Sequence, residues 1–134
     1  MAGRQRRYTD DVPDDATDRL RAMCLALPET HEQRAWVGTR WMVRKRTFAH
    51  VLGIEFDGDA SVAVVSFRSE GEELEVLRRS GHPYLDLGWG RDAMGIVLED
   101  ADWSEVAELV TESFCIMAPK MLVALVDRPL DETP

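Results

Sequence analysis

The feature that most limits the possible folds is a short, almost wholly apolar run at residues 61–67. It reads SVAVVSF and follows GIEFDGDA, which contains a D-G turn signal. A run of this length that is rich in β-branched residues favours a strand, and its lack of polar alternation indicates that both faces are covered. We therefore expect a central strand of a sheet at this position.

Periodic segments before this run predict a helix and a hairpin. One helical stripe consists of Leu20, Met23, Cys24 and Leu27. We expect its helix to begin near residue 14, where acidic residues suit the positive end of the helix dipole, and to stop at Pro28. Residues 40–43 and 47–52 read as two short strands separated by three cations, which predicts a tight hairpin. The intervening segment ETHEQRAWVG has no periodicity and is assigned to a loop.

The second half of the chain carries two capping patterns. Ser69 and Glu72 predict the start of a helix that buries Leu74 and Leu77 and ends at Gly81. Strands near 84–87 and 94–98 then form a second hairpin. Asp102 and Glu105 open a last long helix, and Pro119 kinks it or starts a further one. The residues that this helix is expected to bury are Val106, Leu109, Val110, Phe114 and Met117.

The order of these elements defines the expected fold class. We predict an α+β single domain with a mainly antiparallel five-stranded sheet and helices packed on one face, over residues 14–127. Residues 1–13 and 128–134 are expected to be flexible tails. The 134 residues with 45% apolar content suffice for one domain with its own core.

Charge and composition limit the compartment and the partners. The formal net charge is −9, which disfavours nonspecific attraction to nucleic acid or anionic lipid. No run of about 18 apolar residues exists, so we expect no membrane span, and the polar N-terminus predicts no secretory signal. The two cysteines are far apart in sequence, which favours a reduced, cytoplasmic protein.

The residue types that catalyse reactions or bind metals form no recognisable constellation. His31, His50 and His82 are far apart and lack metal-ligand spacing, so we expect exposed or structural histidines. Cys24 and Cys115 lie on apolar helical stripes and are expected to be small buried hydrophobes. No nucleophile, base and orienting group can be aligned, and no phosphate-binding glycine loop precedes a helix. We therefore expect no enzyme, no metal and no cofactor.

The charge is unevenly distributed along the chain. Residues 34–50 contain five bases and no acid, whereas residues 99–112 contain six acids and no base. The cations at Arg44–Arg46 fill a hairpin loop that lacks glycine, so we expect one of them to have a positive φ. They form either a solvated edge turn or an anion-binding site. The acidic stripe of Glu105, Glu108 and Glu112 either faces solvent or meets a basic partner.

The four tryptophans leave two interpretations open. Trp36 and Trp41 flank the basic region, Trp89 lies in the second hairpin turn, and Trp103 follows the last capping residue. Exposed indoles near cations can stack on nucleic-acid bases. Buried anchors are the favoured interpretation, because an indole offers a large packing area.

Three segments together resemble one protein family. RAMCLALPET, VRKRTFAHVL and DWSEVAELVTESFCIMAPK are similar to segments of the MmcQ/YjbR family, and the similarity runs from about Asp18 to Asp127. The resemblance implies a CyaY-like α+β fold with two hairpin wings, and a DNA-binding role by the family's usual description. The implied wings are Arg44–Arg46 and Gly88–Asp92, and Lys120 matches the lysine of the family's APK motif.

These observations lead to one functional hypothesis and one alternative. The first is a small binding module that contacts the phosphates of duplex DNA through its basic hairpin, without reading sequence. The proposed contact residues are Arg40, Arg44, Lys45, Arg46, Arg91 and Lys120. The alternative is a protein- or small-ligand-binding domain without a nucleic-acid role. Such a domain can be a homodimer in which the basic hairpin of one copy meets the acidic helix of the other.

Overall fold

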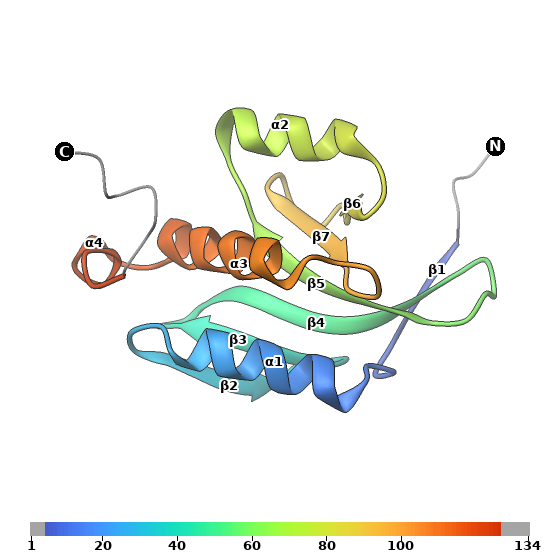
Figure 1. The fold of residues 1–134 in the computed structure, drawn as a ribbon, viewed down its shortest axis with the longest axis horizontal. Coiled ribbons are helices and arrows are strands. Elements are labelled where there is room, and N and C mark those ends of the chain that lie inside the picture. The colour runs from blue at the N-terminus through green and yellow to red at the C-terminus, as the bar shows by residue number, and fades with distance from the viewer. Residues whose placement is uncertain (1–4, 127–134) are drawn as a thin grey trace.

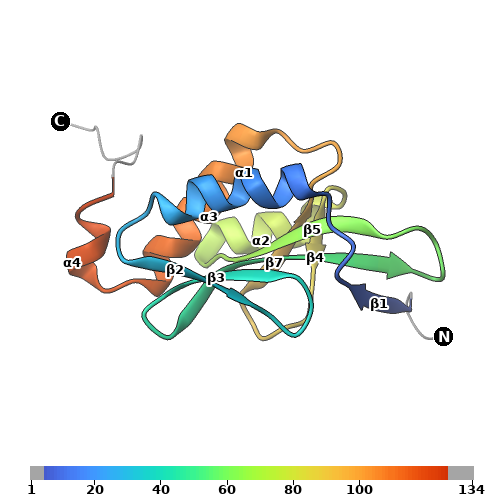
Figure 2. The ribbon, with the colours of Figure 1, turned by 90° about the horizontal axis from the view of Figure 1, so that it is seen from below.

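The chain folds into one antiparallel sheet with its helices on one side. The computed structural model describes residues 5–126. The first half contains β1 (Arg6–Thr9), α1 (Asp14–Leu25), β2 (Thr30–Arg34), β3 (Thr39–Val43), β4 (Arg46–Phe56) and β5 (Val62–Arg68). The second half contains α2 (Gly71–Ser80), β6 (Tyr84–Asp86), β7 (Ala93–Val97), α3 (Trp103–Met117) and α4 (Lys120–Val123). Figure 1 shows these elements, and Figure 2 shows the three longer helices above the sheet.

The sheet has seven strands rather than the expected five. Its order is β2-β3-β4-β5-β7-β6, and β1 pairs with the far end of the long β4. All pairings are antiparallel. The predicted apolar run forms β5, which lies between β4 and β7 with Val64, Val65 and Phe67 buried. The α+β class, the central strand and both hairpins are therefore confirmed.

The two additional strands lie where the sequence is polar. β2 occupies part of the expected loop 29–38. It is an edge strand whose Glu32 accepts hydrogen bonds from Arg21 Nε (2.8 Å) and Trp41 Nε1 (2.9 Å). Because ion pairing and an indole N–H, rather than apolar burial, hold this strand, hydrophobic periodicity gives no signal for it.

The expected N-terminal tail is partly ordered. Within residues 1–13, Arg6–Thr9 form β1 by extending the ladder along β4, with Tyr8 opposite Ile54. A short polar strand gains its order from the pairing groups of a longer neighbour, so its own sequence does not indicate it. Residues 1–4 and 128–134 of the expected tails, and the domain end expected at 127, lie outside the described residues.

The predicted capping residues are confirmed in two of three cases, and α1 begins at Asp14 as expected but ends at Leu25, before Pro28. The Asp102 carboxylate accepts the Ser104 N–H at 2.9 Å and caps α3, and Gly81 ends α2 with a φ of 72°. The predicted Ser69 cap is wrong, because α2 begins after Glu70 without a side-chain cap. Ser69 is instead buried beside the end of β5, where its N–H donates to Asp92 O at 3.0 Å.

Two apolar clusters lie on opposite faces of the sheet. The larger one fills the space under the helices, where Phe48 and Phe114 meet edge to face at 5.5 Å beside the fully buried Trp41. The smaller one lies on the face away from the helices. Its buried members are Leu52, Ile54, Val64, Leu87 and Val97. Val37 and Trp89 from the β2–β3 and β6–β7 connections and Tyr8 from β1 pack against it, and none of the described helices does.

Candidate nucleic-acid interface

The basic hairpin has a two-residue tip. Val43 pairs with Arg46, so only Arg44 and Lys45 form the loop, one residue fewer than expected. Arg44 has a φ of 56°, which confirms the expected positive φ. Two-residue hairpin loops favour positive φ at the first position because it matches the twist of the strands. The tip thus holds a bulky cation in a conformation that glycine adopts more easily.

The hairpin tip lies beside the junction of α3 and α4. Arg44, Lys45 and Arg46 line one side of an open groove of about 610 Å³, and 117–119 line the other. Lys120 directly follows this segment, is exposed, and begins α4. The fold therefore brings Lys120 to the same end of the molecule as a hairpin more than seventy positions earlier in the chain.

Carboxylates neutralise little of this charge. Arg44 Nη2 lies 3.4 Å from Glu29 Oε1, and both side chains are more than half exposed. Such a pair contributes at most about 1 kcal/mol and is screened by salt. Lys45 and Arg46 form no ion pair with any residue of the described part of the chain. We refer to Arg44, Lys45, Arg46 and Lys120 as the hairpin patch.

The other two predicted contact residues lie elsewhere. Arg40 faces the helix-free side from β3, where its Nη2 donates to Gln33 Oε1 at 2.9 Å. β3 ends at Val43, and Arg44 lies in the turn that follows. The alternation of side chains along a regular strand therefore does not place Arg40 and Arg44 on the same face. Arg91 is exposed in the β6–β7 connection. Arg40 and Arg91 therefore lie outside the surface that the other four predicted residues form.

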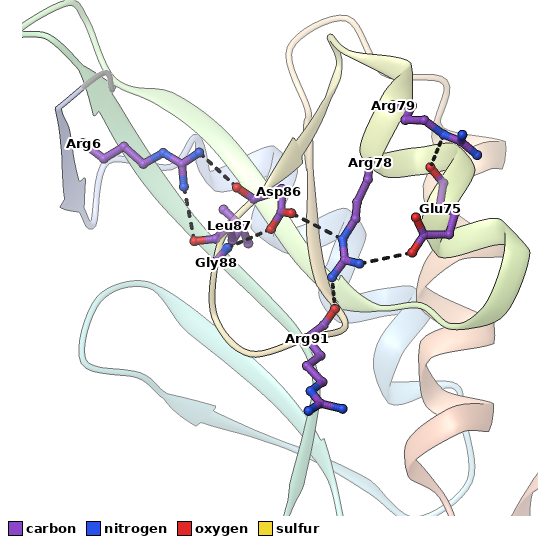
Figure 3. A network of polar contacts seen from close by, with 8 residues as sticks. All are labelled: Arg6, Glu75, Arg78, Arg79, Asp86, Leu87, Gly88 and Arg91. Carbon is purple, nitrogen blue, oxygen red and sulfur yellow. Dashed lines mark hydrogen bonds and ion pairs between the residues drawn. The ribbon is translucent and has the colours of Figure 1, made fainter. Parts of the chain in front are cut away.

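Two arginines, Arg6 and Arg78, fix the β6–β7 connection that carries Arg91. Arg6 donates from Nη2 to Asp86 O (3.0 Å) and from Nη1 to Leu87 O (3.3 Å). Arg78 of α2 pairs through Nε with Asp86 Oδ2 at 3.4 Å and also donates to the carbonyl oxygen of Arg91. Figure 3 shows this network and the Arg91 side chain, which points away from it. Arg91 takes part in this network through its carbonyl oxygen, and its guanidinium group stays outside it.

An aromatic cluster lies on the helix-free face. Tyr8, Trp36, His50 and Trp89 approach one another with ring centroids 5.4–6.3 Å apart. Trp36 comes from the β2–β3 connection and is 67% exposed, which corrects its expected role as a buried anchor. Of the other tryptophans, Trp41 is fully buried as expected, and Trp89 and Trp103 are half-buried. Sequence reasoning did not link these four rings, because they come from segments that are distant along the chain.

His50 is the buried member of this aromatic cluster. Its Nε2 lies 2.6 Å from Val37 O. Burial lowers the pKa of His50, and the nearby Arg40 charge lowers it further, against the opposing effect of the Val37 hydrogen bond. The ring is therefore neutral at pH 7, and Nε2–H donates to Val37 O. This fits the expected structural histidine rather than a metal ligand or general base.

The lowered pKa of His50 predicts a pH dependence of stability. Above about pH 6.5 the ring is neutral in both states. As the pH falls below that value, the unfolded state binds a proton that the folded state does not, so stability decreases. We expect the wild type to lose more unfolding free energy between pH 7 and pH 5 than His50→Gln, as measured by urea denaturation. Equal losses would contradict the assignment, and His31→Gln, which alters an exposed histidine on the same face, is the control.

The two cysteines differ in how deeply they are buried. Cys24 is fully buried, and burial raises the pKa of its thiol, so it is an inert packing group as expected. Cys115 is only half-buried.

Glu105 of the acidic stripe accepts a hydrogen bond from the Tyr84 hydroxyl. Burial and this carboxylate raise the pKa of Tyr84 to about 12, so part of the stripe is engaged within the fold.

No group of three or more His, Cys, Asp or Glu side chains in 5–126 is placed to hold a metal ion. None of the helices described is both long enough and apolar enough to cross a bilayer.

Comparison with known proteins supports the resemblance seen in the sequence. No curated protein matches this chain. The model of the YjbR family matches residues 25–116, which is more than half of the chain. The matched region runs from the end of α1 to the last turn of α3, and therefore includes the basic hairpin and the β6–β7 connection. The chain belongs to the YjbR family.

Proposed function

We propose that this protein is a binding module, not an enzyme, that contacts the phosphate backbone of duplex DNA through the hairpin patch. The supporting observation is that Arg44, Lys45, Arg46 and Lys120 lie at one end of the fold with a single, exposed ion pair among them. Cations so placed attract phosphates at short range, because salt screens the acidic remainder of the molecule over about 8–10 Å. A cytoplasmic location is part of the same proposal.

The patch suits positioning on a backbone rather than sequence reading. Its four cations end long, flexible side chains on exposed segments, and phosphate contacts carry no base information. We therefore expect similar affinity for duplexes of unrelated sequence. Arg40 and Arg91 are not part of this duplex contact, because they belong to the helix-free face.

A charge-matched pair of triple variants tests this proposal. We expect Arg44→Ala/Lys45→Ala/Arg46→Ala to weaken binding to a fluorescein-labelled 20-base-pair duplex by at least about tenfold at 50 mM salt, because three counterion-releasing contacts are lost. The control, Arg7→Ala/Arg19→Ala/Arg79→Ala, removes the same charge outside the hairpin patch and is expected to bind almost like the wild type. Fluorescence anisotropy measures both.

The same variants distinguish duplex binding from the alternative, in which the protein forms a homodimer. If the hairpin of one copy met the acidic helix of another, light scattering would show a dimer that dissociates in the hairpin variant and at high salt. Equal duplex binding by the two triple variants, or no binding by the wild type, would refute the proposed DNA contact.

A further inference from the structure

The helix-free face of the sheet has an unusual charge distribution. The seven strands contain three carboxylates, Glu32, Glu55 and Asp86. All three point to the side that carries the helices. Glu32 pairs with Arg21 of α1, and Asp86 pairs with Arg78 of α2. Glu55 follows Ile54, whose side chain belongs to the cluster on the helix-free face, so the Glu55 side chain points to the other face. The strand positions on the helix-free face therefore carry no acid, in a chain that contains 25 acidic residues.

Cationic and polar side chains occupy the same face. The pairing register aligns Gln33, Arg40, His50 and Ser66 in one row across β2, β3, β4 and β5. Arg40 Nε is buried without a hydrogen-bond partner among the described residues, and only its Nη2 is bonded, to Gln33. Arg68, further along β5, pairs with Asp92 of the neighbouring loop at 2.7 Å. Arg91, next to Asp92, is exposed.

Aromatic rings lie above this row. Trp36 and Trp89 come from two loops that converge over β4, with centroids 6.3 Å apart. Tyr8 and His50 each contact both indoles. The exposed fraction of Trp36, 67%, leaves much of the indole open to solvent on a rigid base. A supported, exposed indole next to cations is the arrangement that stacks on unpaired bases.

The shape of this face disfavours a small metabolite. A hollow of about 140 Å³ lies beside Trp89, with His50, Ser66 and Arg68 in its lining. Small-molecule sites usually start at about 300 Å³. The hollow is therefore too small to enclose such a ligand, but it offers hydroxyl and guanidinium groups to the edge of a base or to a phosphate oxygen.

A symmetric contact between two copies is also disfavoured. In a two-fold dimer through this face, the same patch occurs on both partners. The patch of one copy that carries Arg40 and Arg91 would then face the same cationic patch of the other copy, and the strand positions of that face hold no acidic residue. Like charges in an interface oppose association.

We propose that the helix-free face binds single-stranded nucleic acid, with bases stacked on Trp36 and Trp89 and phosphates held by Arg40 and Arg91. This inference rests on the proposed function, because the ligand is nucleic acid in both. It concerns a different surface of the protein, and single strands instead of duplexes. Bases of a duplex are already stacked on each other, whereas unpaired bases offer their faces to the indoles. A single strand also carries a lower charge density, which suits an acidic protein.

The test compares ligands and variants at 20 mM salt. The probes are fluorescein-labelled dT15 and an abasic 15-mer with the same number of phosphates. We expect the wild type to bind dT15 at least about 5-fold more tightly than the abasic strand, because only dT15 can stack. Trp36→Ala should remove that preference and Trp36→Phe should retain most of it. Val76→Ala, which alters an exposed apolar residue of α2 on the helix side, should leave it unchanged.

Several results would overturn this inference, and each differs from failure of the proposed function. Equal affinity of the wild type for dT15 and the abasic strand excludes stacking, even if Trp36→Ala proves poorly folded. Equal dT15 binding by Trp36→Ala and Val76→Ala excludes Trp36. A free protein whose dimer is lost in Trp36→Ala shows that a second copy occupies the face. Loss of duplex binding in the hairpin triple variant, together with any of these results, leaves the duplex proposal standing and refutes this one alone.

Discussion

Replacing Ser113 by alanine is expected to lower the free energy of unfolding by about 3 kcal/mol. Ser113 is fully buried in α3, where its Oγ accepts the Arg68 N–H at 2.7 Å and donates to Phe48 O at 2.7 Å. One hydroxyl thus satisfies backbone groups at the end of β5 and in β4. The alanine variant leaves a buried donor and a buried acceptor unpaired, each at about 1–3 kcal/mol.

Urea denaturation of Ser113→Ala and Thr111→Ala measures this effect. Thr111 lies in the same helix and is half-buried, so its replacement reports the general effect of removing a hydroxyl from α3. A Ser113→Ala variant within about 0.5 kcal/mol of the wild type would show that α3 is not anchored to the sheet through this hydroxyl.

Replacing Gly38 by alanine is expected to destabilise the fold by a similar amount, at least about 3 kcal/mol. Gly38 has a φ of 72°, and a Cβ there would lie 1.9 Å from Val51 O and 2.9 Å from Val51 C. Conformational strain alone costs about 1–2 kcal/mol, and the clash with backbone atoms of β4 adds to it. The clash also displaces the connection that presents Trp36.

Gly58→Ala separates the two causes. Gly58 has a comparable φ of 83° in the β4–β5 turn, but its added Cβ would meet nothing within 4 Å. We expect this variant to lose only the strain contribution, about 1 kcal/mol. Equal destabilisation by both substitutions, in thermal or urea unfolding, would contradict the close approach of Gly38 to β4.

Much of the fold follows from local signals in the sequence. The apolar run predicted β5, the stripe from Leu20 to Cys24 predicted α1, and Asp102 predicted the start of α3, each from a few neighbouring residues. All three are confirmed, although Leu27 of the expected stripe lies beyond the end of α1. The polar strands β1 and β2 escaped prediction because their order comes from partners. β1 depends on the length of β4, and β2 on the bonds of Glu32 to Arg21 and Trp41.

The candidate site also combines features that a local sequence pattern predicts with features that depend on the three-dimensional fold. The hairpin and a positive φ among its three cations depend on a local pattern and were predicted, although the tip has two residues instead of three. The separation of Arg40 from Arg44 depends on where β3 ends, which a charge count does not show. The aromatic cluster joins Tyr8, His50 and Trp89 across distant segments, so no spacing within the sequence reveals it.

The salt dependence of duplex binding reports how many phosphate contacts the hairpin patch makes. In the proposed contact, four cations of the hairpin patch displace counterions from a phosphate backbone. For four contacts, the logarithm of the association constant should fall with the logarithm of salt concentration at a slope of about −3.6. Anisotropy titrations of the wild type with one 20-base-pair duplex between 20 and 200 mM salt measure it. A slope near that value agrees with the account, whereas a flat slope, or no binding at 20 mM salt, contradicts it.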